Sequence, residues 1–209
     1  MKIASVYYRG VHPFDKFFPT AEIVFVDSPE QVTEDIGLLI FHGGADISPS
    51  IYGQKAARWC YASDELSRRD AVELACMRRA AELNIPTFGI CRGAQLQCAF
   101  NGGALVQDVG NHSGVHQIIT ADSKSLTVNS IHHQMMLPDP GSIILAWAPE
   151  LAKGTYMGEK GPINVNKEAE AVYFPRTRSF GVQWHPEMME ASAPATRWVF
   201  NAMMERGIL

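Results

Sequence analysis

The sequence predicts an α/β fold: a mostly parallel sheet flanked by helices, with an added antiparallel section. Strand-like runs alternate with helix-like runs in the first half, which is typical of parallel strands joined by helices. The second half is richer in strand-like runs, which indicates antiparallel pairing. The chain has 209 residues, so we expect a single domain over residues 1–209 with a substantial core.

Local composition predicts each element in turn. Val, Ile, Phe and Tyr fill the expected strands of the first half, at residues 2–8, 21–26, 37–41 and 87–90. Ala, Glu, Arg and Leu are frequent in an expected helix at residues 67–84, and a second expected helix at residues 92–101 is stopped by Gly102 and Gly103. The second half supplies five further strands and a closing helix followed by glycine, at residues 115–120, 126–130, 143–148, 169–173, 180–184 and 193–206.

Composition excludes several classes of protein. The net charge is −4 and no basic stripe is present, so we expect no binding to nucleic acid. The apolar runs are too short to span a bilayer, and the first residues lack the apolar core of a signal peptide. None of the four cysteines forms a C-x-x-C pair or suggests a disulfide framework. We therefore expect a cytoplasmic protein with reduced thiols, no membrane contact and no cofactor.

Cys91 is the candidate nucleophile. It is flanked by Gly89 and Gly93 between an expected strand and an expected helix, which is the pattern of a nucleophile elbow with Cys in place of Ser. The following helix points its positive end at the thiol and favours the thiolate. The N–H of Arg92 then faces the place where an oxyanion would form. A buried structural cysteine at a strand–helix junction is the alternative. For Cys76 and Cys98, a place in the core is our interpretation.

His185 is the candidate base among the seven histidines of the chain. It ends an expected strand, Pro186 forces a turn, and Glu187 can hold one ring nitrogen while the other faces Cys91. A purely structural His–Glu pair is the alternative without the elbow. A metal site is a further alternative that we do not favour, because the spacing of its candidate ligands is loose. Those candidates are His112, His116, His132 and His133.

Two motifs together resemble the class I (triad) glutamine amidotransferase superfamily: Gly-Ile-Cys-Arg-Gly-Ala-Gln at residues 89–95 and His-Pro-Glu at 185–187. Segments at residues 43–53, 101–108 and 128–134 are similar to its γ-glutamyl-γ-aminobutyrate hydrolase branch. The resemblance implies a flavodoxin-like sheet, a Cys91–His185–Glu187 triad, and an oxyanion hole formed by Gly44 and Arg92. It also implies a set of residues that hold the glutamyl head group, namely Gln95, Ser130, Ile131, His132 and His133.

The function expected from this resemblance is cysteine-dependent hydrolysis of a γ-glutamyl amide. One form is a glutaminase that gives glutamate and ammonia to a separate synthetase chain. The alternative is a stand-alone hydrolase of γ-glutamyl amines, and a catalytically silent regulator of the same fold is a third hypothesis. The substrate is glutamine or a γ-glutamyl amide, and a synthetase or a second copy of the chain is the candidate protein partner. Residues 54–67 look abbreviated and residues 138–167 carry few family signals, so the leaving group stays open.

Overall fold

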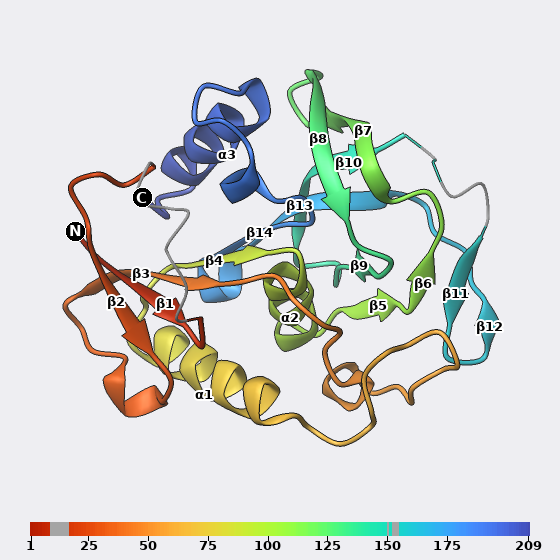
Figure 1. The fold of residues 1–209 in the computed structure, drawn as a ribbon, viewed down its shortest axis with the longest axis horizontal. Helices are drawn as coiled ribbons and strands as arrows, with labels where there is room; N and C mark the ends of the chain where they lie inside the picture. Colours follow the sequence, from red (N-terminus) through yellow and green to blue (C-terminus); the bar gives the residue numbers. More distant parts are fainter. Residues whose placement is uncertain (9–16, 150, 152–154) are drawn as a thin grey trace.

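The computed structural model describes residues 1–8, 17–149, 151 and 155–209. Its centre is a sheet in which five parallel strands lie side by side in the order β2-β1-β3-β4-β14 (Figure 1). This is the strand order of flavodoxin-like folds, and it confirms the predicted α/β class. The five strands are Lys2–Val6 (β1), Glu22–Val26 (β2), Ile36–Phe41 (β3), Thr87–Ile90 (β4) and Ser179–Val182 (β14).

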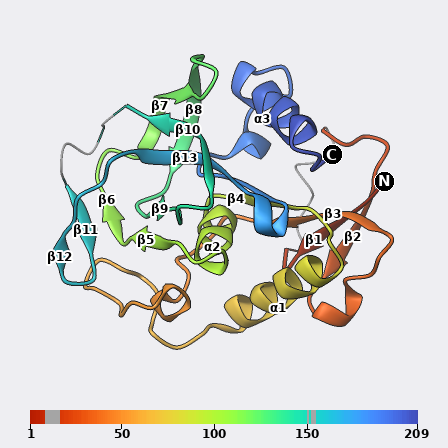
Figure 2. The same cartoon turned by 180° about the vertical axis from the view of Figure 1, so that it is seen from behind.

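Helices cover both faces of this sheet, as Figures 1 and 2 show from opposite sides. Because side chains alternate along a strand, Leu39 and Phe41 pack toward α1 and α2, whereas Leu38 and Ile40 pack toward α3. Ser67 starts α1 with a capping box that involves Asp70. The longest helix of the described chain has 15 residues, and none of the described helices is long and apolar enough to cross a bilayer. The helices are Arg68–Glu82 (α1), Arg92–Phe100 (α2) and Pro194–Glu205 (α3).

The predicted antiparallel section extends the sheet beyond β14 in the order β13-β10-β7-β8. These four strands are Ser113–Thr120 (β7), Ser125–Ile131 (β8), Ile143–Ala148 (β10) and Glu168–Phe174 (β13). Five shorter strands were not predicted, because two or three residues carry no readable alternation. Two of them, β5 and β9, join the main sheet, and the others form a small separate sheet. They are Ala104–Val106 (β5), Asp108–Val109 (β6), Met135–Leu137 (β9), Tyr156–Gly158 (β11) and Gly161–Pro162 (β12).

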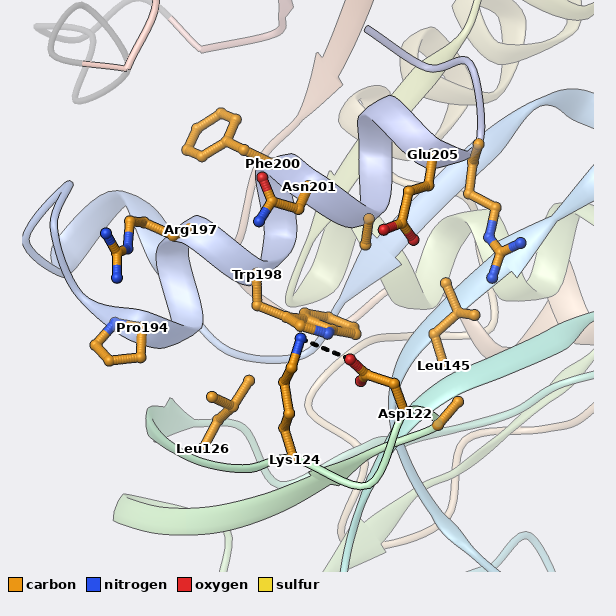
Figure 3. Close-up of a pocket in the computed structure, with 13 residues that line it drawn as sticks. Asp122, Lys124, Leu126, Leu145, Pro194, Arg197, Trp198, Phe200, Asn201 and Glu205 are labelled. Carbon is orange, nitrogen blue, oxygen red and sulfur yellow. Dashed lines mark ion pairs between the residues drawn. The ribbon is translucent and has the colours of Figure 1, made fainter.

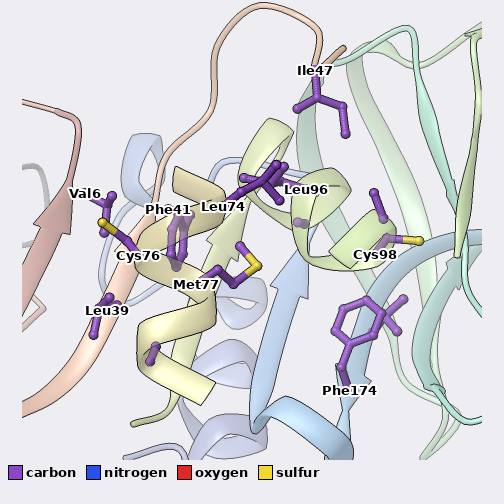
Figure 4. Packing of buried hydrophobic residues seen from close by; sticks show 14 of the residues in the cluster. Val6, Leu39, Phe41, Ile47, Leu74, Cys76, Met77, Leu96, Cys98 and Phe174 are labelled. Carbon is purple, nitrogen blue, oxygen red and sulfur yellow. The ribbon is translucent and has the colours of Figure 1, made fainter. Parts of the chain in front are cut away.

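Cys76 and Cys98 lie in the hydrophobic cluster between the sheet and helices α1 and α2 (Figure 4). Both side chains are fully buried, which confirms their predicted place in the core. Burial raises the pKa of the Cys76 thiol to about 12 and that of Cys98 further still. Neither thiol is therefore ionised near neutral pH, and neither competes with Cys91 as a nucleophile.

Candidate active site

Three neighbouring parallel strands bring the predicted site together. β3, β4 and β14 end at the same edge of the sheet, because parallel strands share one direction. Gly43 and Gly44 follow β3, Cys91 follows β4, and His185 follows β14 after two further residues. A contact between loops that are far apart in sequence therefore follows from strand order alone.

Cys91 occupies a strained turn. Its backbone has φ of 50° and ψ of −109°, a conformation that costs free energy in a residue other than glycine. Its N–H donates to the carbonyl of Val182 at 2.7 Å, which ties the turn to β14. A Cβ on Gly93 would lie 2.2 Å from the carbonyl oxygen of Phe41, and one on Gly89 would lie 2.5 Å from Oε1 of Gln97. Glycine is therefore needed on both sides, as the elbow motif predicts.

The His185 ring lies between Cys91 and Glu187. Its Nδ1 is 2.6 Å from Oε1 of Glu187, and the ring lies beside Cys91, since a Cβ on Gly43 would contact both the ring and Cys91. Burial of the ring disfavours the imidazolium, but its interactions with Cys91 and Glu187 outweigh burial and raise the pKa of His185 to about 10. A Cβ on Gly43 would lie 2.7 Å from Cε1 of this ring, so the glycine lets the loop after β3 pack closely against it.

Asn129 on β8 makes two hydrogen bonds with the backbone of His185. Its Oδ1 accepts the N–H of His185 at 2.9 Å, and its Nδ2 donates to the carbonyl of His185 at 3.0 Å. The two bonds fix the point from which the imidazole projects. This role was not predicted, because the contact joins residues 56 positions apart in the chain.

The two predicted oxyanion residues lie next to each other. A Cβ on Gly44 would lie 3.6 Å from Cδ of Arg92, and the φ of Gly44 is +148°, which favours glycine. The Arg92 side chain is buried and pairs with both Asp70 and Glu73 of α1. This pairing fixes the first residue of α2 and hence the direction of its N–H.

Arg69 connects the same ion network to the loop after β3. Its Nε pairs with Oε1 of Glu73 at 2.8 Å, and its Nη2 donates to the carbonyls of His42 at 2.9 Å and Gly43 at 3.1 Å. The carbonyls of this loop are thus turned toward α1. The role of Arg69 was not predicted either, because these partners lie 27 and 26 positions away.

The predicted substrate-binding residues fall into two groups. Gln95 is buried and donates to the carbonyl of Gln134 at 3.1 Å. The Ser130 hydroxyl donates to the carbonyl of His112, and the His132 ring hydrogen-bonds the carbonyl of Gln134. Both side chains therefore make hydrogen bonds within the protein. Ile131 is 63% exposed.

His133 forms the second group with two carboxylates. Its Nε2 is 2.9 Å from Asp46 and its Nδ1 is 3.3 Å from Asp108. The hydrogen bond with Asp46 is the main cause that raises the pKa of His133. The Tyr61 ring packs against this ring at 4.7 Å between centroids, tilted by 53°, and the backbone N–H of Tyr61 donates to Asp46. Residues 54–67 therefore form a wall beside His133, although the segment is short.

A separate pocket of about 630 Å³ lies between α3 and the β7–β8 hairpin (Figure 3). Trp198 and the Asp122–Lys124 ion pair, at 2.7 Å, line part of it. None of the predicted site residues lines this pocket, so the chemistry of Cys91 belongs elsewhere on the molecule.

The fold and the sequence together place the chain among the class I glutamine amidotransferase-like proteins. The sequence model of the Peptidase C26 family matches residues 25–153, and the chain belongs to this family. The glutamine amidotransferase-like protein YvdE of Lactococcus lactis is 31% identical over 89% of this chain and 82% of its own length. Protein NtpR of Enterococcus hirae is 27% identical over 86% of this chain and 80% of its own length.

Solved structures share the fold at lower sequence identity. A protein of Thermoplasma acidophilum assigned as a GMP synthase subunit superposes with a TM-score of 0.65 at 19% identity, covering 99% of this chain and 93% of that one. A glutamine amidotransferase of Thermotoga maritima superposes with a TM-score of 0.64 at 16% identity, covering 100% of this chain and 86% of that one. The glutaminase domain of Trypanosoma brucei CTPS, with bound acivicin, superposes with a TM-score of 0.60 at 16% identity, covering 97% of this chain and 92% of that one.

Proposed function

We propose that the protein hydrolyses the amide bond of a γ-glutamyl compound through a Cys91 thioester, with His185 and Glu187 completing a catalytic triad. The observation that carries this proposal is the hydrogen-bonded pair of Glu187 and His185 beside Cys91, at the ends of two paired parallel strands. Because Glu187 holds Nδ1, Nε2 of the imidazole is left for the thiol and for the leaving group.

The chemistry follows from this arrangement in two steps. The Cys91 sulfur attacks the γ-carbonyl carbon, His185 gives its proton to the leaving nitrogen, and the C–N bond breaks to release an amine or ammonia. A water molecule then gives a proton to His185 and attacks the thioester, and the C–S bond breaks to release the γ-carboxylate. The N–H groups of Gly44 and Arg92 stabilise the oxyanion in both steps, a donor of this kind being worth about 2.7–4 kcal/mol.

The glutamyl head group needs a partner for its ammonium and one for its carboxylate. Asp46 and Asp108 offer negative charge beside His133, whose raised pKa favours the imidazolium. We assign the ammonium to these carboxylates, and His133, whose two ring nitrogens both face them, holds them in place. Since the side chains of Ser130 and His132 already hydrogen-bond protein carbonyls, residues 130–132 contact the head group through their backbone.

We favour a glutaminase that delivers ammonia to a separate synthetase chain. Two further relatives support this choice: the carbamoyl phosphate synthase small chain of Campylobacter jejuni and a glutamine-hydrolysing GMP synthase subunit of Methanoregula boonei. The carbamoyl phosphate synthase chain is 28% identical over 63% of this chain and 32% of its own length. The GMP synthase subunit is 30% identical over 51% of this chain and 54% of its own length. A stand-alone hydrolase of γ-glutamyl amines is the second candidate, which the segment Val128 to Gln134 favours.

A substrate panel on the purified protein separates these functions, with released glutamate as the readout. Turnover of glutamine supports the glutaminase, and turnover of γ-glutamyl amines alone supports the hydrolase. We expect Cys91→Ala to abolish hydrolysis and Cys98→Ala to retain it. Intact-mass analysis should also find a covalent adduct of a glutamine-like diazo-ketone on wild-type protein and none on Cys91→Ala. Full activity in Cys91→Ala would contradict the mechanism.

A further inference from the structure

A second group of chemically active side chains lies apart from the triad. His112 precedes β7, His132 follows β8, and Glu170 lies within β13. All three are buried, and one ligand atom from each falls within 4.8 Å of the others. The strands meet in the antiparallel part of the sheet, where Figure 1 shows β7 and β8 beside β10 and β13.

The hydrogen bonds around His112 fix which ring nitrogen carries a proton. Its Nε2 is 3.3 Å from Oε2 of Glu168. That carboxylate also accepts the Tyr156 hydroxyl at 2.7 Å and the N–H of Leu151 at 2.9 Å, so it acts as an acceptor. The Nε2 of a neutral His112 therefore carries the hydrogen, and its Nδ1 presents a bare lone pair.

His132 is oriented in the same way by a different partner. Its Nδ1 is 2.9 Å from the carbonyl oxygen of Gln134, which can only accept. Nδ1 therefore donates, and Nε2 presents the lone pair. A histidine that donates from one nitrogen to a carboxylate or carbonyl, and leaves the other bare, is prepared to bind a metal ion.

Both bare nitrogens face Glu170. His112 Nδ1 is 3.3 Å and His132 Nε2 is 3.7 Å from Oε1 of Glu170, yet neither nitrogen makes a hydrogen bond within the described residues. Oε2 of Glu170 also has no partner there. Two ligands about 2.1 Å from a tetrahedral Zn²⁺ lie about 3.4 Å apart, which matches these separations.

We propose that His112, His132 and Glu170 bind a Zn²⁺ ion. Two imidazoles and one carboxylate are a common ligand set for Zn²⁺, and a water molecule would complete four-coordination. His116 supports the site, because its Nε2 is 3.2 Å from Oε1 of Glu170 and holds that carboxylate. The sequence suggested three of these histidines as metal ligands but gave no carboxylate to join them.

The ion would stiffen the wall that faces the triad. It ties β13 to both ends of the β7–β8 hairpin, whose Asn129 holds His185. It also fixes His132, which is bonded to the same Gln134 carbonyl that receives Gln95.

A proton is the competing occupant of the cluster. Burial lowers the pKa of His112, but the hydrogen bond with Glu168 and the negative charge of Glu170 outweigh burial and raise the pKa to about 9. An imidazolium at this position would have no lone pair left for a metal ion, so the two occupants exclude each other.

Metal titration of the full-length protein, stripped with a chelator, distinguishes the two occupants. We expect about one Zn²⁺ per chain with a dissociation constant below about 1 µM, together with release of protons and a higher Tm. Co²⁺ should give the visible absorption of a tetrahedral site, and Zn²⁺ should abolish it. Binding weaker than that, or no cobalt spectrum, would overturn the proposal and leave a proton-bridged cluster.

Two variants locate the ion. His132→Gln and Glu170→Gln should each lower the affinity for Zn²⁺ at least tenfold, because each removes one of three ligands. His133→Gln is the matched control, since it is the neighbouring histidine outside the cluster and should leave the zinc content unchanged. Equal zinc content in all three variants would refute this assignment. If the two cluster variants do not fold, as judged by circular dichroism, the cobalt titration of the wild-type protein decides.

Discussion

Replacing Asn129 with alanine tests whether the proposed base is held through its backbone. The change removes both hydrogen bonds to His185, at 2.9 and 3.0 Å. It leaves the buried N–H without a partner, whereas the carbonyl still accepts the N–H of Met188 at 3.1 Å. One unpaired buried group costs about 1–3 kcal/mol, so we expect a loss of about that size in the free energy of unfolding. A shift of the imidazole also lowers kcat by about 10- to 100-fold, with KM little changed.

Urea unfolding and steady-state kinetics measure the two effects. Asn129→Asp retains the acceptor for the His185 N–H and loses only the donor to the carbonyl, which Met188 still satisfies, so it should lose less free energy of unfolding than Asn129→Ala. Asn166, which is exposed, is the matched control, and Asn166→Ala should change stability by less than about 0.5 kcal/mol. Wild-type kcat in a folded Asn129→Ala protein would refute the idea that this side chain positions His185.

Three further predictions concern the same site. Because His185 must hold a proton to protonate the leaving group, activity should fall as pH rises through the His185 pKa of about 10. In a pH–rate profile, Glu187→Gln should move this fall about one pH unit lower. Gly93→Ala puts a Cβ 2.2 Å from the Phe41 carbonyl oxygen and should cost about 1–3 kcal/mol in urea unfolding, and an unchanged midpoint would contradict this. Arg92→Met leaves the buried Asp70 without its cation and Glu73 with Arg69 alone, and it should lower stability by about 3–5 kcal/mol. A smaller loss at low pH would confirm the electrostatic cause.

The features that could be predicted from sequence are those in which neighbouring residues determine the geometry. The elbow around Cys91 and the pair His185 and Glu187 are contiguous motifs, and the longer strands carry their own hydrophobic pattern. Asn129 and Glu170 could not be predicted. Their partners come from other strands, so their role depends on sheet register, and register is not encoded in any short window. The same reason explains why the two- and three-residue strands were missed.

Asp70 links the folding of one helix to the geometry of another. Its carboxylate receives the Ser67 hydroxyl and N–H at the start of α1, and it also pairs with Arg92 at the start of α2. Fraying of the first turn of α1 would therefore release the arginine that orients an oxyanion donor. Amide hydrogen exchange should show these two helix starts opening as one cooperative unit. A substitution on the outer surface of α1 could then reduce turnover without touching any group that meets the substrate.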